Sequence, residues 1–260
     1  MFKKILPVLL LLIMFIMSGC KEQKQLNQYE QIVERDKLIV GVKTDSKPFG
    51  YIDGGTLEIV GFDIDVARRI AKDILGSESK VKLIPVTPED RMEALTSGKV
   101  DIIIATMSIT KQRENIIDFS EPYFIAGQSA AVINNGKIQS YADLNQKRVL
   151  VVLGTTAAEN IKSNIPGSLI VGYKNYDDLF SSLKSSRGDA AVTDDVILSG
   201  FIMDNPEYKI LNPRLTIEPY GVGIRKGSDS AALKFAINRT IHDMKQDGTI
   251  NELKQKWGVN

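Results

Sequence analysis

The sequence predicts an α/β protein that consists of two similar lobes. Apolar runs typical of strands alternate along the chain with segments whose apolar residues recur every four positions, as in helices. Two stretches 88 residues apart, EALTSGKVDIIIAT and SSLKSSRGDAAVTD, resemble each other, and both end in polar residues. Two lobes of one design whose strand ends face each other would hold a ligand between them. A common helix-turn-strand unit that recurs by chance is the alternative explanation.

Length and composition are those of an ordinary globular protein. The chain has 260 residues, of which 43% are hydrophobic and 25% charged, so it can form one large domain or two small ones. The net charge of +1 gives no reason to expect nucleic acid as a partner. Cys20 is the only cysteine and His242 the only histidine. We therefore expect no internal disulfide, no metal cluster, no Ser-His catalytic triad and no cofactor.

The N-terminus is expected to direct export rather than to join the fold. Residues 1–19 hold a basic start, an apolar run from Ile5 to Met17 and a small-residue site before Cys20, which resembles a bacterial lipoprotein signal peptide. Cleavage before Cys20 would leave a lipid on its thiol, with residues 20–36 as a tether to the outer face of the cytoplasmic membrane. A transmembrane anchor is the alternative, but the apolar run is shorter than the ~20 residues that a span requires.

The first half of the chain is expected to alternate strands with helices. Residues 61–75 have Phe62, Val66 and Ile70 four positions apart, as one face of a helix requires. Thr87 is expected to cap the next helix. The expected elements are strands at 37–42, 81–86 and 102–104 and helices at 61–75 and 87–98. Such alternation indicates a sheet that is parallel for the most part.

The second half repeats this alternation. A strand ends in Gly154, and Thr156 and Glu159 after it have the spacing of a capping box, so a helix is expected to begin there. The other expected elements are strands at 128–133, 148–153, 169–173 and 190–192 and helices at 176–185, 233–244 and 250–257. In the 88-residue alignment of the two halves, Thr106 falls on Asp194, so both strands of the matched pair end in a polar side chain.

A candidate anion site lies in the stretch from Val100 to Phe124. Its strand ends in small hydroxyl residues, and Thr110 can cap a helix whose first turn holds Arg113. A helix N-terminus offers free backbone N–H groups, and a guanidinium matches a carboxylate with two parallel hydrogen bonds. The alternative is that Arg113 is a solvated surface residue. We expect this stretch to bind a small anion.

Six motifs in succession support a family assignment: GFDIDVARRIAKDIL, RMEALTSGKVD, ATMSITKQRENIIDFSEPYF, GTT, DAAVTD and PYGVGIRKGS. Over residues 37–258 the chain resembles the bacterial solute-binding proteins of amino-acid ABC transporters, extracellular family 3. The resemblance implies a periplasmic-binding-protein-like fold, in which two Rossmann-like lobes are joined by two hinge segments with the ligand cleft between them. It places lobe 1 at residues 37–124 plus 220–260 and lobe 2 at residues 125–219.

The resemblance also implies which residues hold the ligand. Arg113 would take the α-carboxylate, together with Ser108 and the backbone N–H of Thr156. The α-ammonium would go to Asp194, the carbonyl of Thr106 and Ser108. The chemistry agrees with this assignment, because a zwitterion needs a cation on one side and a carboxylate on the other within a water-poor cleft.

Three further residues are expected to meet the ligand's side chain. Lys43 stands where many relatives carry Asp, Ser46 stands where they carry a stacking aromatic, and Pro88 replaces a second aromatic. Arg91 follows in the first turn of the next helix, and two cations without an aromatic sandwich suit a second carboxylate. We therefore expect an acidic amino acid, glutamate or aspartate. Two alternatives remain: Lys43 and Arg91 could be surface residues paired with Asp45, Glu89 or Asp90, and the ligand could be glutamine or another polar amino acid.

The expected role is that of a binding protein rather than an enzyme. The partners would be a free amino acid and the permease subunits of an ABC importer, and the protein itself would be a monomer. A sensory ligand-binding module is an alternative. A cyclohexadienyl dehydratase-like enzyme on the same fold is a second alternative, which the basic, aromatic-poor pocket disfavours.

Overall fold

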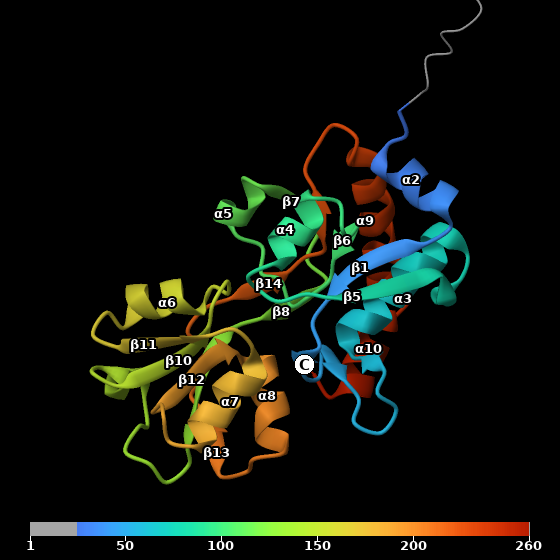
Figure 1. Ribbon diagram of the computed structural model, residues 1–260. Helices are drawn as coiled ribbons and strands as arrows, with labels where there is room; N and C mark the ends of the chain where they lie inside the picture. The colour runs from blue at the N-terminus through green and yellow to red at the C-terminus, as the bar shows by residue number, and fades with distance from the viewer. Residues whose placement is uncertain (1–24, 260) are drawn as a thin grey trace, which may run out of the picture.

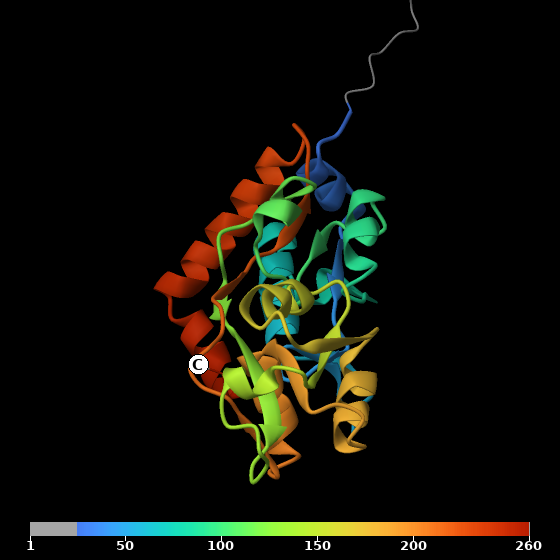
Figure 2. The same ribbon diagram turned by 90° about the vertical axis from the view of Figure 1, so that its left-hand side faces the viewer.

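The computed structural model describes residues 25–259. Within this range, two five-stranded sheets form the centres of two lobes, and a pair of short strands connects them (Figure 1). Figure 2 shows the long helix α9 (Ala231–Gln246) along the outer side of the lobe that is drawn at the top. This is the two-lobed α/β fold that the sequence predicts. Of the described helices, none is both long enough and apolar enough to cross a membrane.

Lobe 1, as we name it here, consists of the first sheet and the elements packed around it. Its sheet has the order β5 (Val81–Pro85), β1 (Leu38–Val42), β6 (Ile102–Ile103), β15 (Gly223–Arg225), β7 (Ile117–Phe119). Its helices are α2 (Gln28–Arg35), α3 (Phe62–Leu75), α4 (Arg91–Thr96), α5 (Lys111–Glu114), α9 (Ala231–Gln246) and α10 (Thr249–Trp257). A small sheet lies beside them, formed by β2 (Asp45–Ser46), β3 (Gly50–Ile52) and β4 (Ile59–Val60).

Lobe 2 is built on the same plan. Its sheet has the order β11 (Leu169–Tyr173), β10 (Arg148–Val152), β12 (Ala190–Asp194), β9 (Gln128–Ile133), β13 (Tyr208–Ile210). Its helices are α6 (Ala157–Asn164), α7 (Tyr176–Lys184) and α8 (Asp195–Met203). The connecting strands are β8 (Phe124–Ala126) and β14 (Glu218–Tyr220), which pair antiparallel. The lobe boundaries expected from the sequence, after residues 124 and 219, fall inside these two strands.

Each sheet is mixed rather than mostly parallel. In lobe 1, β1 pairs parallel with β5 and β6, whereas β15 pairs antiparallel with β6 and β7. Lobe 2 has the same division between two parallel and two antiparallel pairings. The reason lies in the connection. β9 and β15 directly follow the connecting strands, so they begin at the edge where the parallel strands end, and must run in the opposite direction.

The 88-residue similarity corresponds to equivalent positions in the two lobes. β6 and β12 are both third in their sheets and pair parallel with β1 and β10. Asp101, just before β6, accepts the backbone N–H of Ile39 at 2.7 Å. Asp189, just before β12, accepts the backbone N–H of Arg148 at 2.8 Å. The two aspartates therefore satisfy the same strand N–H in each lobe, which a chance similarity does not explain.

Two helices were not expected from the sequence. Residues 28–35 lie in the segment assigned to the tether, but they form α2, where Asn27 and Glu30 make a capping box and Ile32 is buried. Residues 195–203 form α8, whose Val196, Leu198 and Phe201 are all buried. This segment is apolar on nearly every side, so it lacks the one-sided periodicity that identifies a surface helix.

Candidate functional site

A closed cavity lies where the strand ends of the two lobes meet. Its free volume is about 10 Å³, about the space of one water molecule. An amino acid can therefore enter only when the lobes move apart. Its lining residues are Pro88, Arg91, Thr106, Ser108 and Arg113 from lobe 1 and Gln128, Thr155, Thr156, Tyr176, Thr193 and Asp194 from lobe 2.

Arg113 reaches into the cavity from a short helix. The expected cap is confirmed, because the Thr110 hydroxyl accepts the backbone N–H of Arg113 at 3.2 Å. The guanidinium donates from Nη1 to the Ser108 carbonyl at 2.8 Å and from Nη2 to the Gly154 carbonyl of lobe 2 at 3.1 Å. Burial lowers the pKa of Arg113, and the nearby carboxylate of Glu218 works against this shift. Arg113 is thus a half-buried cation at the lobe interface rather than a fully solvated residue.

Arg91 is a second cation in the same cavity, and its side chain is buried. Its Nη1 donates to the Ala105 carbonyl at 2.8 Å, and its Nη2 donates to the Gly154 carbonyl at 3.4 Å. Its Nε is fully buried and has no hydrogen-bond partner. Burial, and next the charge of Arg113, lower the pKa of Arg91 to about 9. Both guanidiniums therefore meet at one neutral carbonyl, which leaves their charge available for a ligand.

Asp194 lies at the end of β12, on the lobe 2 side of the cavity. It is buried, and its Oδ2 accepts the hydroxyl of Tyr220. Burial, followed by the charge of Glu218, raises the pKa of Asp194 to about 7, against the opposing influence of Tyr220 and Arg113. The cavity therefore holds a carboxylate whose charged form a cationic ligand group would stabilise.

Thr106 has an unusual backbone that lobe 1 holds in place. Its φ is 45°, in the left-handed region that a non-glycine residue rarely adopts. Its N–H donates to Asp63 Oδ2 at 2.8 Å, and the hydroxyl of Tyr123 donates to Asp63 Oδ1 at 2.8 Å. Burial raises the pKa of Asp63 to about 7, although both hydrogen bonds oppose the shift. Asp63 does not line the cavity, but it fixes the loop that does.

The sequence did not identify a hydrogen-bonded network at the base of lobe 2. Gln128 donates from Nε2 to Thr156 Oγ1 at 2.6 Å, and Thr156 donates to Glu218 at 3.2 Å. Asn160 also donates to Glu218, at 3.0 Å. The predicted capping box of Thr156 and Glu159 is wrong, because Thr156 makes no side-chain cap and its hydroxyl is taken by this network. Gln128, a polar residue at the start of an apolar strand, was the available signal.

Lys43 and Ser46 do not line the cavity. The Nζ of Lys43 lies 2.7 Å from Asp45 Oδ1, and it sits 5.3 Å from the centre of the Tyr176 ring. The pairing with Asp45 was one of the alternatives considered, but Lys43 is 2% exposed and is therefore no surface residue. Ser46 is fully buried, and its hydroxyl lies 3.2 Å from Asp45 Oδ1. Of the three residues expected at the ligand's side chain, the structure places only Arg91 in the cavity wall.

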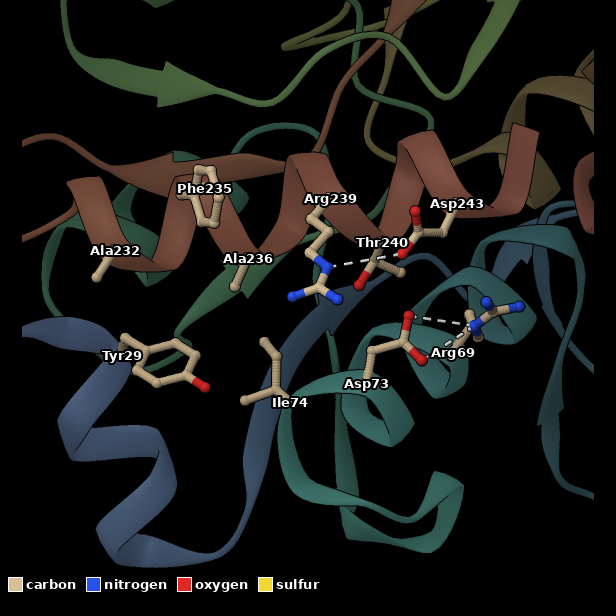
Figure 3. A pocket seen from close by; sticks show the side chains of 10 residues that line it. All are labelled: Tyr29, Arg69, Asp73, Ile74, Ala232, Phe235, Ala236, Arg239, Thr240 and Asp243. Atoms are coloured by element: carbon tan, nitrogen blue, oxygen red, sulfur yellow. Dashed lines mark hydrogen bonds and ion pairs between the residues drawn. The ribbon is translucent and has the colours of Figure 1, made fainter. Parts of the chain in front are cut away.

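A larger groove of about 500 Å³ lies on the outer side of lobe 1, between α2, α3 and α9 (Figure 3). Its charged residues form ion pairs with each other, Arg69 with Asp73 and Arg239 with Asp243. We assign it no ligand. Across residues 25–259, no group of three or more His, Cys, Asp and Glu side chains could hold a metal ion.

Comparisons with known proteins agree with this geometry. The family model described as bacterial extracellular solute-binding proteins, family 3, matches residues 38–260. The ABC transporter glutamine-binding protein GlnH of Bacillus subtilis (strain 168) is 41% identical over 241 residues, which cover 92% of this chain and 87% of that protein. The glutamine-binding protein of Geobacillus stearothermophilus is 43% identical over 201 residues, which cover 77% of each chain.

A solved structure gives the same picture. An ancestral arginine-binding protein bound to glutamine superimposes with a TM-score of 0.79 at 40% sequence identity, over 86% of this chain and 98% of that chain.

Proposed function

Because the chain belongs to the bacterial extracellular solute-binding proteins of family 3, we propose that it captures a free amino acid, glutamine, for an ABC importer. The carrying observation is that Arg113 of lobe 1 and Asp194 of lobe 2 line the same closed cavity. A cation and a carboxylate on opposite lobes match the two charged ends of an amino acid. A ligand that joins them stabilises the closed form.

The backbone of the ligand is assigned to residues of both lobes. Arg113 binds the α-carboxylate with Ser108 and the backbone N–H of Thr156. Asp194 binds the α-ammonium with Ser108 and the carbonyl of Thr106. In support, all five residues line the cavity, and the two guanidinium bonds of Arg113 go to neutral carbonyls that a carboxylate can outcompete.

The side-chain subsite favours glutamine over glutamate. Lys43, the second cation on which the acidic ligand depends, is paired with Asp45 outside the cavity. Arg91 and Arg113 are offset by Asp194 and Glu218, so a ligand without net charge leaves these groups balanced, whereas glutamate adds one negative charge. The unpartnered Nε of Arg91 can donate to a carboxamide oxygen. Both curated relatives described above are named for glutamine.

The remaining parts of the role follow the family. Cys20, which lies outside the described residues, carries the lipid anchor that keeps the protein on the outer face of the cytoplasmic membrane. The two lobes together dock on the permease and release the amino acid there. The relatives are named as binding proteins, which supports transport rather than catalysis.

A thermal-shift screen of the twenty amino acids, on protein that starts at Lys21, tests the ligand. We expect glutamine to raise the melting temperature by roughly 5 to 10 °C when its concentration is about 100 times Kd, because binding to the folded state alone adds about 2.7 kcal/mol. A shift with glutamate or aspartate but none with glutamine would restore the acidic ligand. No shift with any of the twenty would contradict amino-acid binding altogether.

A further inference from the structure

A contact between the lobes lies beside the ligand cavity. Asp45 follows the end of β1 in lobe 1, and its Oδ2 accepts the backbone N–H of Tyr176, the first residue of α7 in lobe 2, at 2.9 Å. Its other oxygen, Oδ1, holds Lys43 Nζ at 2.7 Å. The same ammonium faces the ring of Tyr176 at 5.3 Å. Two residues of lobe 1 thus hold one residue of lobe 2 by its backbone and by its ring.

The electrostatics of this contact favour the closed form. α7 has nine residues, and a carboxylate at its first N–H is stabilised by the positive end of the helix dipole. Lys43 and Asp45 are only 2% and 10% exposed. Burial lowers the pKa of Lys43, and the ion pair with Asp45 opposes this shift. A buried pair of this kind is sensitive to the loss of either partner, because the remaining charge is left without compensation.

Tyr176 connects this contact to the ligand. Its side chain lines the cavity, and its hydroxyl lies 2.8 Å from Thr193 Oγ1, next to Asp194 in β12. We propose that Lys43 and Asp45 form an interlobe clasp that positions Tyr176 as a wall of the ligand cavity and slows the release of the bound amino acid. This inference rests on the amino-acid binding proposed above, and it assigns to Lys43 a role outside the ligand's contacts.

An exposed ion pair that joins the two lobes provides a control. Lys47 Nζ lies 3.0 Å from Oδ2 of Asp204, the residue that follows α8 in lobe 2. The two side chains are 40% and 65% exposed. Exposed pairs contribute little, because water screens the charges and two long side chains lose freedom. Lys47 is thus an exposed lysine whose ion pair crosses the cleft, whereas Lys43 is buried and contacts the other lobe through the ring of Tyr176.

The clasp predicts a selective change in the rate of ligand release. In Lys43→Met, the glutamine dissociation rate measured by stopped flow should rise roughly tenfold, since a desolvated contact between an ammonium and an aromatic ring, such as that of Lys43 with Tyr176, is worth about that much. The association rate should stay within about threefold, which a general loss of the folded state would not allow. Lys47→Ala should release glutamine at the wild-type rate. If Lys43→Met releases glutamine no faster than Lys47→Ala does, the clasp is disproved.

Hydrogen exchange at the Tyr176 amide tests the clasp without relying on glutamine. Asp45→Ala removes the acceptor of this N–H, so its exchange should be at least about tenfold faster than in wild type, while Lys47→Ala leaves it unchanged. If wild type binds no amino acid, the proposed function fails, yet this exchange measurement still decides the clasp. Equal exchange in wild type and Asp45→Ala would disprove it.

Discussion

At the residue scale, the two arginines of the cavity are assigned different parts of the ligand, so their substitutions should affect binding differently. Arg113 is assigned to the α-carboxylate, which every amino acid carries, whereas Arg91 is assigned to the side-chain subsite. Arg113→Met should therefore weaken the binding of every amino acid by roughly 100-fold or more, because a charge-assisted bidentate contact is lost. Calorimetric titration with glutamine and its analogues would measure this.

Arg91→Met is the matched control, since it removes the same chemical group from the same cavity. The Arg91→Met protein should bind glutamine more weakly than wild type, but its binding should still be measurable. If the two variants lose the same affinity for glutamine, it is incorrect that Arg113 binds a group common to all amino acids while Arg91 binds the side chain. Only the motif placed Arg113 between the lobes, where it lines the cavity, because spacing alone also permits a solvated first-turn residue.

The ionisation of the buried Asp63 carboxyl affects the stability of the folded protein. Burial raises its pKa from 3.8 to about 7. Between pH 4 and 7 the folded protein therefore binds more protons at this residue than the unfolded chain, so the free energy of unfolding falls as the pH rises through this range.

The size of this dependence is testable by substitution. Asp63 should lower the free energy of unfolding by up to about 1.4 kcal/mol for each unit by which the pH rises. Asp63→Asn should remove this dependence, because asparagine has a similar shape but does not ionise. Urea unfolding of both ligand-free proteins at pH 5 and pH 7.5 would measure the difference between the two slopes. Identical slopes would show that Asp63 stays ionised in the folded protein throughout this range.

At the scale of single elements, α8 illustrates how packing between lobes constrains a helix. Gly200 lies inside this helix, and a Cβ at this position would meet the carbonyl oxygen of Lys47 in lobe 1 at 2.2 Å. The neighbouring backbone of lobe 1 thus requires glycine only while the lobes are closed.

Gly200→Ala should separate stability from binding. In the open protein, alanine stabilises a helix by up to about 1 kcal/mol over glycine, so the ligand-free melting temperature should stay equal or rise. Closure is obstructed, so the affinity for glutamine should fall at least about tenfold. Ser199→Ala, on the exposed side of the same helix, should bind glutamine normally. Normal affinity in Gly200→Ala would show that the bound form is less closed than this structure.

The sequence predicted elements with a one-sided pattern and missed those without one. α3 was found within one residue of its start, because Phe62, Val66 and Ile70 repeat at the helical period. α8 was missed because it is apolar on nearly every side. The cap at Thr156 failed for another reason: its hydroxyl bonds Glu218, 62 residues away along the chain, and local spacing carries no information about that contact.

At the scale of the whole molecule, the two lobes were predictable and their contacts were not. The internal similarity and the polar strand ends indicated a crevice with Arg113 and Asp194 on opposite sides, and both residues do line one cavity. The bond between Asp45 and Tyr176 joins residues 131 positions apart and belongs to no repeating pattern. It could not be derived before the lobes were placed against each other, and Lys43 was therefore assigned to the ligand.

The mixed sheets have a consequence for the order in which the chain can fold. The sheet of lobe 2 is drawn from one continuous segment, residues 128–210, whereas β15, at residues 223–225, lies between β6 and β7 of lobe 1. As the chain emerges from the ribosome or the export channel, lobe 2 can complete its sheet while lobe 1 still lacks an internal strand. The lobe whose synthesis begins first is thus the lobe that is completed last. The sheet cannot join β6 to β7 until β15, near the end of the chain, is available to pair with both.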